Sequence, residues 1–526
     1  MRLPFVEEQP LFYNTYSLTM QKVFSIPQIR EADRYTIENE PIASVDLMER
    51  AARACYTWMV SNIKDLDTAT VMVVCGMGNN GGDGLALARM LASDGMRVEV
   101  YVIALSDKGS PDFEINKQRL SAMGINICHV SLAEDFLLNL SVDIIVDAVL
   151  GSGLTRPLEG EMAKIIQKIN AFDAEKIAID IPSGLFTDKS SVGNMVFRVH
   201  HTLTFQFPKL PFFFPENEQF VGEFHVLDIS LHKTYIAETS TSIYYVDVLD
   251  IPQSMISRPK FSHKGTFGHA LLIAGCFGKM GAAIFAAKAC MYMGVGLLTV
   301  HLPYDAVGCM QMAFPEAMVS IDKGNDIFTS LPVELDKYNA AGVGPGLGTN
   351  EKSVSALKKF LIEWNKPLIL DADALNMIAM DKEEMSPLLK PNTIITPHVK
   401  EFKRWVGEWS NDFERLEKQK TLAKNYGIIV VLKGANTSIC CPDGEVYFNS
   451  TGNPGMATGG SGDVLTGVIT SLLAQGFTAK EAAVLGVYLH GLAGDKAAER
   501  VGQVSMTASD ICLGVRQVMK DVRQRK

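Results

Sequence analysis

Short apolar segments alternate with helical segments along most of the chain, and this alternation allows only a few folds. The first such segment, Thr70–Cys75, is uncharged throughout, as expected for a strand buried on both faces of a parallel sheet. Later segments repeat the pattern, with expected strands at Val98–Ile103, Asp143–Leu150, Lys176–Ile181, Thr202–Phe207, Ala270–Ala274, Leu297–His301, Ala340–Val343, Pro367–Leu370, Thr393–Thr396 and Ile428–Leu432. Expected helices lie between or after them at Leu85–Ser93, Glu161–Phe172, Ala282–Tyr292, Ala479–Val501 and Met506–Met519. Strands separated by helices predict right-handed, mostly parallel α/β layers.

The length predicts more than one domain. At 526 residues the chain exceeds the size of one ordinary domain. The segment His232–Pro259 shows little periodicity and contains Pro252 and Pro259, which places a boundary near residue 240. We therefore predict an α/β protein with domains at residues 20–240 and 241–526.

Composition excludes several classes of partner. The formal net charge is −10 and no basic cluster occurs, which argues against a nucleic-acid partner. No apolar run reaches membrane-spanning length, and residues 1–19 lack the continuous apolar core of a signal peptide. The nine cysteines are odd in number and form no CxxC pair, which favours a reducing compartment. We expect a cytoplasmic protein that acts on small molecules.

A glycine-rich segment, Gly76–Gly84, follows the first expected strand. Gly76, Gly78 and Gly81 match the GxGxxG pattern of dinucleotide-binding loops. The match is weak because Asn79, Asn80 and Asp83 would crowd a pyrophosphate turn, and no Lys-Ser/Thr follows as in a Walker A loop. Polar side chains in such a loop instead suggest coordination of a cation or a polar substrate.

Two further strand ends carry polar groups. Asp147 lies near the end of one expected strand, and Asp180 and Ser183 lie at the end of the next. Ligands bind at the carboxyl ends of strands in open α/β sheets, so these loops can converge. Asn80, Asp147 and Ser183 would offer oxygen ligands, which suit K⁺, Na⁺ or Mg²⁺. Taken singly, each of these residues could equally cap a helix or form a turn.

The adjacent histidines His200 and His201 also suggest a metal pair. Neighbours in a strand point to opposite faces, so they cannot ligate one ion together. We interpret both as structural.

The segment Thr451–Gly476 runs from a glycine-rich loop into an apolar helix expected to begin near Ser461. Gly459, Gly460 and Gly462 allow backbone N–H groups to approach a ligand closely, and the start of a helix adds unpaired N–H groups and a partial positive charge. This arrangement predicts a phosphate site. Asp463 in the first turn could accept a proton from a substrate hydroxyl. The alternative is a flexible turn with Asp463 as an N-terminal charge cap.

Five other loops in the second half carry glycine or polar residues at strand ends. Asp371 and Asp373 could face one site and help hold Mg²⁺, although Asp373 could equally be a helix N-cap. His398 is more typical of a cap than of a catalyst. Lys433 could meet a phosphate as a point charge, or could be solvated.

The motifs GNNGGDG, VDAVLGSGL and IDIPSG, in this order, resemble the epimerase domain of NAD(P)H-hydrate repair enzymes over roughly residues 26–230. The resemblance implies a Rossmann-like three-layer domain. It implies that K⁺ is bound by Asn80, Asp147 and Ser183, and that Asp180 contacts substrate at the reacting centre. It also implies that the hydrated nucleotide is held by Asn79, Asn80, Gly81, Gly82, Asp83, Gly151, Ser152, Gly153, Leu154, Thr155, Arg156 and Pro157.

The motifs GCFGKMGAA, VGPGLG, LDADALN, TPHVKEF, LKGANT and TGGSGD resemble the dehydratase domain of the same enzymes, which has a ribokinase-like fold, over roughly residues 264–520. The resemblance implies that Asp463 is the base that accepts the hydroxyl proton. It implies contacts to the hydrated dinucleotide from Ala282, Gly346, His398 and Asp463. The implied adenine-nucleotide residues are Lys433, Gly434, Ala435, Asn436, Thr437 and Gly462.

The leading hypothesis is a bifunctional enzyme that repairs hydrated nicotinamide cofactors. One domain would epimerise the R and S forms of NADHX and NADPHX, with K⁺. The other would dehydrate the S form with Mg²⁺ and ADP, giving AMP and phosphate, and ATP stays open as the donor. One alternative is a C-terminal vitamin-precursor kinase, and another is an N-terminal binding domain without catalysis. A homo-oligomer is expected.

Overall fold

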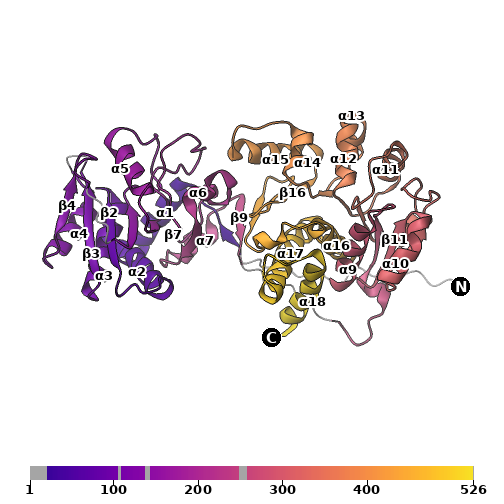
Figure 1. Ribbon diagram of the computed structural model, residues 1–526, viewed down its shortest axis with the longest axis horizontal. Coiled ribbons are helices and arrows are strands. Elements are labelled where there is room, and N and C mark those ends of the chain that lie inside the picture. The colour runs from indigo at the N-terminus through magenta and orange to yellow at the C-terminus, as the bar shows by residue number, and fades with distance from the viewer. Residues whose placement is uncertain (1–19, 105–107, 137–141, 248–257, 525–526) are drawn as a thin grey trace. The chain divides into compact units, whose positions relative to one another are not determined.

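The computed structural model describes residues 20–104, 108–136, 142–247 and 258–524 (Figure 1). The expectation for residues 1–19 lies outside this range. The chain divides into two compact units, one formed by Gln21–Ile243 with Ser410–Arg415 and the other by Tyr244–Trp409 with Leu416–Lys526. Each unit contains its own parallel sheet, and each is described by itself below.

The first unit is a parallel sheet with the strand order β4-β3-β2-β5-β6-β7-β8. The chain builds the sheet outward from β2 to β4 and then returns to β5 on the other side of β2. This reversal leaves a crevice at the carboxyl ends of β2 and β5, where α/β sheets bind ligands. The strands of this sheet are β2 (Thr70–Cys75), β3 (Arg97–Ile103), β4 (Ile127–Val130), β5 (Ile144–Ala148), β6 (Glu175–Ile179), β7 (His201–Phe205) and β8 (Glu223–Leu227), and the short strand β1 (Gln21–Lys22) lies outside it.

Helices cover both faces of this sheet, as the predicted three-layer fold requires. Alternate β2 residues divide between two cores, because successive strand side chains point to opposite faces. Val71, Val73 and Cys75 pack with α2, α3 and α4, whereas Met72 and Val74 pack with α5. The helices are α1 (Ile26–Asn39), α2 (Ser44–Asn62), α3 (Asn79–Ser93), α4 (Pro111–Ser121), α5 (Gly160–Asn170), α6 (Glu218–Val221) and α7 (Lys233–Glu238).

The expected boundary of α3 was wrong. The sequence suggested a loop up to Gly84, but α3 begins at Asn79 and contains most of the polar glycine-rich segment. A Cβ at Gly81 would lie 1.8 Å from the Gly76 carbonyl oxygen, so only glycine allows the helix to start this close to the end of β2. The first turns of α3 therefore bring Asn79, Asn80 and Asp83 to the carboxyl edge of the sheet.

The second unit has a larger sheet with the order β9-β18-β17-β16-β15-β14-β13-β10-β11-β12. The pairs from β16 to β12 are parallel, and β16-β17 and β17-β18 are antiparallel, so that β17 and β18 form a hairpin. The strands are β9 (Ile243–Val246), β10 (His269–Ile273), β11 (Leu297–Leu302), β12 (Met318–Ile321), β13 (Ala340–Val343), β14 (Leu368–Leu370), β15 (Ile394–Ile395), β16 (Ile429–Leu432), β17 (Ser438–Cys440) and β18 (Val446–Asn449).

The helices of this unit include a buried central one, α16, which begins at Ser461 as predicted. Gly460 precedes it with φ +94°, a conformation that favours glycine. The set is α9 (Met280–Tyr292), α10 (Val307–Ala313), α11 (Glu351–Glu363), α12 (Asp373–Met380), α13 (Lys382–Met385), α14 (Val399–Val406), α15 (Asp412–Tyr426), α16 (Ser461–Ala474), α17 (Ala479–Val501) and α18 (Ala508–Gln524). A short 3₁₀ turn at Lys264–Phe267 precedes β10.

Small residues let α16 pack tightly against its neighbours. A Cβ at Gly467 would lie 2.1 Å from the Ala286 carbonyl oxygen of α9, and a Cβ at Gly342 of β13 would lie 2.2 Å from the Thr470 hydroxyl. Every residue of α16 from Val464 onward is buried. This packing fixes the position of its amino terminus, where the predicted phosphate loop lies.

The cysteines are free, and most of them are buried. Seven lie in the interior, Cys128 is half-buried and Cys309 is exposed. Burial raises the pKa of these interior thiols, to about 12 for Cys441 and Cys512. Among the described residues, no helix has the length and apolar character needed to cross a membrane.

Gly467→Ala is predicted to destabilise the second unit by about 1–3 kcal/mol, because the added methyl group meets backbone rather than a movable side chain. The matched control is Gly308→Ala in α10, where an added Cβ has open space. The control should leave stability unchanged or raise it by up to about 1 kcal/mol, since alanine favours helix. Chemical denaturation followed by circular dichroism measures both, and equal effects would contradict the packing argument.

Candidate functional sites

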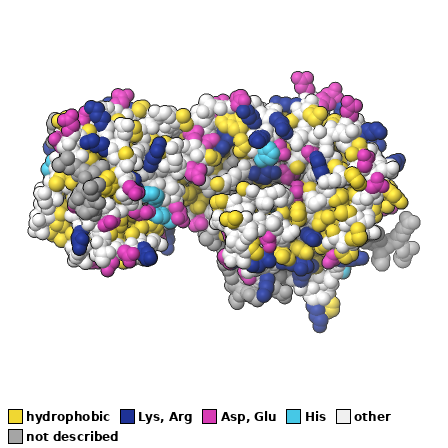
Figure 2. Space-filling view, viewed as in Figure 1, with side chains coloured by type: hydrophobic (Ala, Val, Ile, Leu, Met, Phe, Trp, Pro, Cys, Tyr) yellow, Lys and Arg dark blue, Asp and Glu magenta, His cyan; other side chains and the backbone are white. Residues whose placement is uncertain are grey.

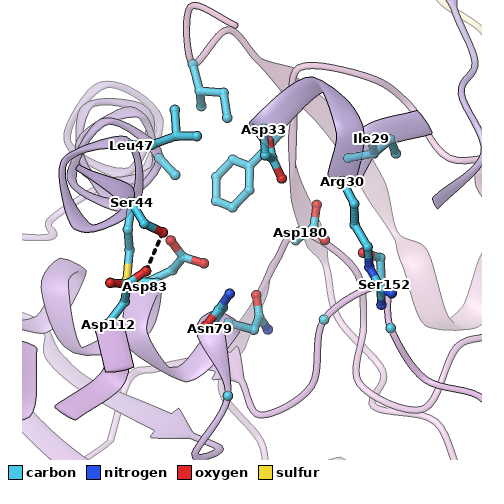
Figure 3. A pocket seen from close by; sticks show the side chains of 18 of the residues that line it. Ile29, Arg30, Asp33, Ser44, Leu47, Asn79, Asp83, Asp112, Ser152 and Asp180 are labelled. Carbon is cyan, nitrogen blue, oxygen red and sulfur yellow. Dashed lines mark hydrogen bonds between the residues drawn. The ribbon is translucent and has the colours of Figure 1, made fainter. Parts of the chain in front are cut away.

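The first unit contains a cavity of about 780 Å³ at the carboxyl edge of its sheet (Figure 3). Three segments that are distant in sequence line it: the start of α3, the loop after β5 and Asp180 after β6. The predicted residues that line the cavity are Asn79, Asn80, Asp83, Gly151, Ser152, Gly153, Leu154, Thr155, Arg156 and Asp180. Three predicted residues, Gly81, Gly82 and Pro157, do not line the cavity. Gly81 and Gly82 pack against other parts of the protein, because an added Cβ at either position would meet neighbouring protein atoms. Pro157 directly follows the segment that lines the cavity.

Helix α1 forms another wall of this cavity, with side chains that the sequence did not single out. Figure 3 shows Asp33 and Asp180 pointing into the same space and Arg30 reaching toward Ser152. Burial and, to a smaller extent, the nearby Asp180 carboxylate raise the pKa of Asp33 to about 7, although Lys209 opposes both effects. Asp33 can therefore carry or release a proton near neutral pH. No local sequence pattern marked Asp33 as a site residue.

Asp180 is held by a buried lysine that was also missed. Asp180 follows β6 with φ +66°, a left-handed conformation that is uncommon for a residue with a Cβ. The Lys209 ammonium donates to Asp180 Oδ1 and to the Thr204 hydroxyl, and the Lys209 side chain is only 2% exposed. This ion pair fixes the direction in which the carboxylate faces the cavity.

Asp147 and Ser183 are hydrogen-bonded to each other and do not themselves line this cavity. Asp147 is fully buried and accepts from the Ser183 amide (2.7 Å), the Ser183 hydroxyl (2.6 Å) and the Val149 amide (3.1 Å). Burial raises its pKa to about 6 despite these bonds, and no ion pair to it occurs among the described residues. A buried carboxylate without a cationic partner fits a bound monovalent cation.

Asn80 supports the same reading. A Cβ at Gly151 would lie 3.4 Å from the Asn80 Cβ, so Asn80 lies beside the loop that follows Asp147. Its amide nitrogen is buried without a hydrogen-bond partner among the described residues. Because amide nitrogen and oxygen are interchangeable by a flip, the same position can present an oxygen to a cation.

In the second unit, three side chains join the end of β14 to the start of α16. Asp371 is 1% exposed and accepts from Lys433 Nζ (2.8 Å) and from the Thr466 hydroxyl (2.8 Å). Lys433 is therefore not a solvated loop residue but part of a buried network. A Cβ at Gly462 would lie 3.4 Å from Lys433 Nζ, which places the lysine charge beside the amino terminus of α16.

Asp463 lies in the first turn of α16, next to this network. Burial raises its pKa to about 7, Asp371 and Asp373 add to the rise, and Lys433 opposes it. Asp373 is not a helix N-cap: it is the first residue of α12, and its Oδ2 accepts from the Gly348 amide at 2.7 Å. The carboxylates of Asp371 and Asp373 therefore add negative charge near Asp463 at the start of α16.

The other predicted residues of this unit lie in the loops around it. A Cβ at Gly346 would lie 3.1 Å from the Ala282 Cβ, so these two residues are in contact. His398 caps α14, with Nδ1 accepting from the Lys400 and Glu401 amides, as its cap alternative predicted. The segment Gly434, Ala435, Asn436 and Thr437 forms the turn from β16 to β17, closed by bonds between Gly434 and Thr437.

One buried histidine in this region was missed. His490 of α17 contacts the Ser461 carbonyl oxygen through Nε2 at 3.0 Å. Burial lowers its pKa to about 4, so the ring is neutral at physiological pH and donates one hydrogen bond. His490 therefore holds the first residue of α16 in place.

Charges are mixed over the visible surface. Lys and Arg side chains alternate with Asp and Glu, without a continuous basic stripe, on the face shown in Figure 2. This distribution agrees with the net charge of −10 and with small-molecule ligands.

Two family models match the chain, one for each unit. The model described as NAD(P)H-hydrate dehydratase matches residues 270–514, and the model described as YjeF-related protein N-terminus matches residues 44–210. The chain is thus of the class that joins a YjeF-type N-terminal domain to a dehydratase domain.

Relatives of the whole chain identify the family. A bifunctional NAD(P)H-hydrate repair enzyme of Thermofilum pendens is 36% identical over 516 residues, covering 96% of this chain and 97% of the relative. The Escherichia coli enzyme of the same description is 32% identical, covering 93% and 92%. A solved Bacillus subtilis ADP/ATP-dependent NAD(P)H-hydrate dehydratase, co-crystallised with ATP and Mg²⁺, is 31% identical with a TM-score of 0.44, covering 51% of this chain and 94% of that one. The chain belongs to the family of bifunctional NAD(P)H-hydrate repair enzymes.

Lys209→Met is predicted to lower the free energy of unfolding by about 3–5 kcal/mol, because it leaves Asp180 without its buried partner. Lys164→Met is the matched control, since Lys164 is exposed and pairs with Glu161 on the surface of α5. The control should change stability by less than about 1 kcal/mol. Urea unfolding of both variants provides the measurement, and a small effect at Lys209 would contradict the role of the ion pair.

Proposed function

We propose that residues 20–240 epimerise the R and S hydrates of NADH and NADPH, and that residues 241–526 dehydrate the S form with ADP as phosphoryl donor. The observation that carries the proposal is the pair of carboxyl-edge sites in one chain. One site holds two carboxyl groups facing a cavity, and the other holds a carboxylate and a lysine at a helix amino terminus.

The epimerase chemistry needs a base and an acid. The hydrate carries a hydroxyl on the carbon beside the ring nitrogen. Asp180 would accept the hydroxyl proton, so that a carbonyl forms as the carbon–nitrogen bond breaks, and protonated Asp33 would supply a proton to the released nitrogen. Rotation of the aldehyde and reversal of both transfers closes the ring on the other face and returns each proton. The pKa of about 7 suits Asp33 to this exchange.

Asn79, Asn80, Asp83 and the segment Gly151–Pro157 would hold the nucleotide in this cavity, with Gly81 and Gly82 shaping the start of α3. The oxygens of Asn80, Asp147 and Ser183 would hold K⁺, whose charge would balance the buried Asp147 carboxylate and fix the loop after β5.

The dehydratase would proceed by phosphoryl transfer. Asp463 would take the proton of the hydrate hydroxyl as the oxygen attacks the terminal phosphorus of ADP, giving AMP and a phosphorylated hydrate. The ring nitrogen then drives out phosphate to give an iminium ion, and the departing phosphate takes a proton from the next ring carbon, which restores the dihydropyridine. Mg²⁺ held near Asp371 and Asp373 would neutralise phosphate charge.

In this scheme Lys433 and the amino terminus of α16 at Gly462 stabilise the transferring group, because both lie beside Asp463. The turn Gly434–Thr437 would contact the adenine nucleotide. Ala282, Gly346 and His398 would contact the hydrate.

The test is to incubate the full chain with a mixture of the R and S hydrates, Mg²⁺ and either ADP or ATP. The measured quantity is the absorbance of the reduced cofactor, which returns as the hydrates are repaired. Complete recovery of both isomers is expected, with ADP as the better donor. No recovery with either donor would overturn the proposal, and a stable phosphorylated product would show a kinase instead.

Two variants should separate the two activities. Asp463→Asn is predicted to lower dehydration by at least about 100-fold while leaving epimerisation intact, because the lost base acts only in the second unit. Asp180→Asn and Asp33→Asn should lower epimerisation and leave dehydration intact, so that only the S isomer is consumed. Chromatographic separation of the isomers measures this, and unchanged epimerisation in Asp180→Asn would refute its role.

The dehydration rate is predicted to fall as the pH drops through about 7, because Asp463 must be ionised to act as base. Burial and Asp373 raise the pKa of Asp463 and Lys433 lowers it. Asp373→Asn should therefore shift the acidic limb of the pH–rate profile to lower pH, and Lys433→Met should shift it to higher pH. Shifts of the same sign would contradict this electrostatic account.

A further inference from the structure

We propose a transition-metal site, of the type that takes Zn²⁺, formed by His201, Glu223 and His225 at the amino edge of the first unit's sheet. One ligand atom of each residue lies within 4.8 Å of those of the other two. His201 cannot share an ion with its neighbour His200, because successive residues of an extended segment point to opposite faces. The ligand partners come instead from the adjacent strand.

Strand register brings these three side chains together. β7 and β8 are parallel, with His201 opposite Glu223 and Leu203 opposite His225. Glu223 and His225 are two residues apart, so both point to the same face of the sheet as His201. The site therefore depends on backbone hydrogen bonds of the fold rather than on flexible loops.

The spacing of the imidazole nitrogens fits a shared metal ion. His201 Nδ1 and His225 Nε2 lie 3.2 Å apart. Two nitrogens bound to Zn²⁺ at about 2.0–2.1 Å with a tetrahedral angle are separated by about 3.3 Å. The two rings are already placed as neighbouring ligands of one ion, and Glu223 is positioned to give a third.

The surroundings also match a metal site. His201 Nε2 lies 3.4 Å from Glu175 Oε1, so the nitrogen that would not bind metal can donate to a carboxylate, an arrangement that orients metal-bound histidines.

Trp58 of α2 packs against both rings, with centroid distances of 5.1 Å to His201 and 4.6 Å to His225 (α2 and β7 in Figure 1). This contact limits ring rotation. His201 and Glu175 also line a second cavity of about 540 Å³.

The site is separate from the catalytic cavity. His201 and Glu223 are the first residues of their strands, whereas Asp180 follows the end of β6, and parallel strands place these ends at opposite edges of the sheet. β8 is the outermost strand on its side. A bound ion would tie this edge strand to β7 and stabilise the unit without taking part in the reaction.

The test is calorimetric titration of chelator-treated, nucleotide-free full chain with Zn²⁺. We expect one site that is lost in His225→Phe, which keeps a ring against Trp58 but has no nitrogen. Glu175→Gln should weaken binding by about 10–100-fold, as loss of an orienting carboxylate does. Thermal unfolding with and without Zn²⁺ should show stabilisation of the parent chain and none of His225→Phe.

The matched control is His200→Asn, since His200 is the adjacent histidine and its Nδ1 accepts from the Lys176 amide, a role that asparagine can retain. This control should bind Zn²⁺ like the parent, and epimerisation should be unchanged in His225→Phe. If the parent chain does not bind Zn²⁺, the contact between His201 and His225 is only a hydrogen bond between two imidazoles, and the proposal is overturned. Binding that survives in His225→Phe, or that is lost equally in His200→Asn, would overturn it as well.

Discussion

The close approach of a helix to a neighbouring backbone carbonyl governs both sites of this chain, at the end of β2 in the first unit and against α9 in the second. At Gly81 and at Gly467 the neighbouring carbonyl oxygen occupies the volume that a methyl group would need. In the first unit this contact brings Asn80 and Asp83 into a cavity, and in the second it places Asp463 beside Lys433. Without such contacts the helix starts would move outward, and the polar side chains would lie in water with ordinary pKa values.

The carboxylates of the two sites differ in how readily they bind a proton, although they are the same chemical group. Asp371 is satisfied by a lysine and a hydroxyl, so it serves as a fixed support. Asp33 and Asp463 have fewer compensating contacts, and their pKa values of about 7 suit proton transfer. Asp147 lies between these cases, with three donors but no cation among the described residues. The difference is the number and charge of the partners rather than burial itself.

Much of the fold was predictable because buried parallel strands are short and apolar. The segments at Thr70–Cys75 and Ala340–Val343 were predicted with the bounds that the structure shows. Elements with mixed composition, such as β8 and α4, were missed, because an edge strand and an exposed helix carry no long apolar signal. The start of α3 was misplaced because glycine and asparagine are poor helix formers, and tertiary contact overrode that preference.

Sequence motifs predicted the site residues that lie on loops, but they did not predict the residues that contact and position them. Lys209, Asp33 and His490 act through contacts between segments that are far apart in sequence, and no local pattern marks such contacts. The metal-site histidine His225 is a further case, since only the register of β7 and β8 places it beside His201.

The burial of the cysteines has a consequence for the chemical durability of the chain. The thiolate is the form that oxidants and electrophiles attack, and burial keeps the interior thiols protonated. None of the residues assigned to either reaction is a cysteine. The chemistry of both sites is therefore independent of the redox poise of the surrounding compartment, and exposed Cys309 on α10 is the position at which oxidative modification would begin.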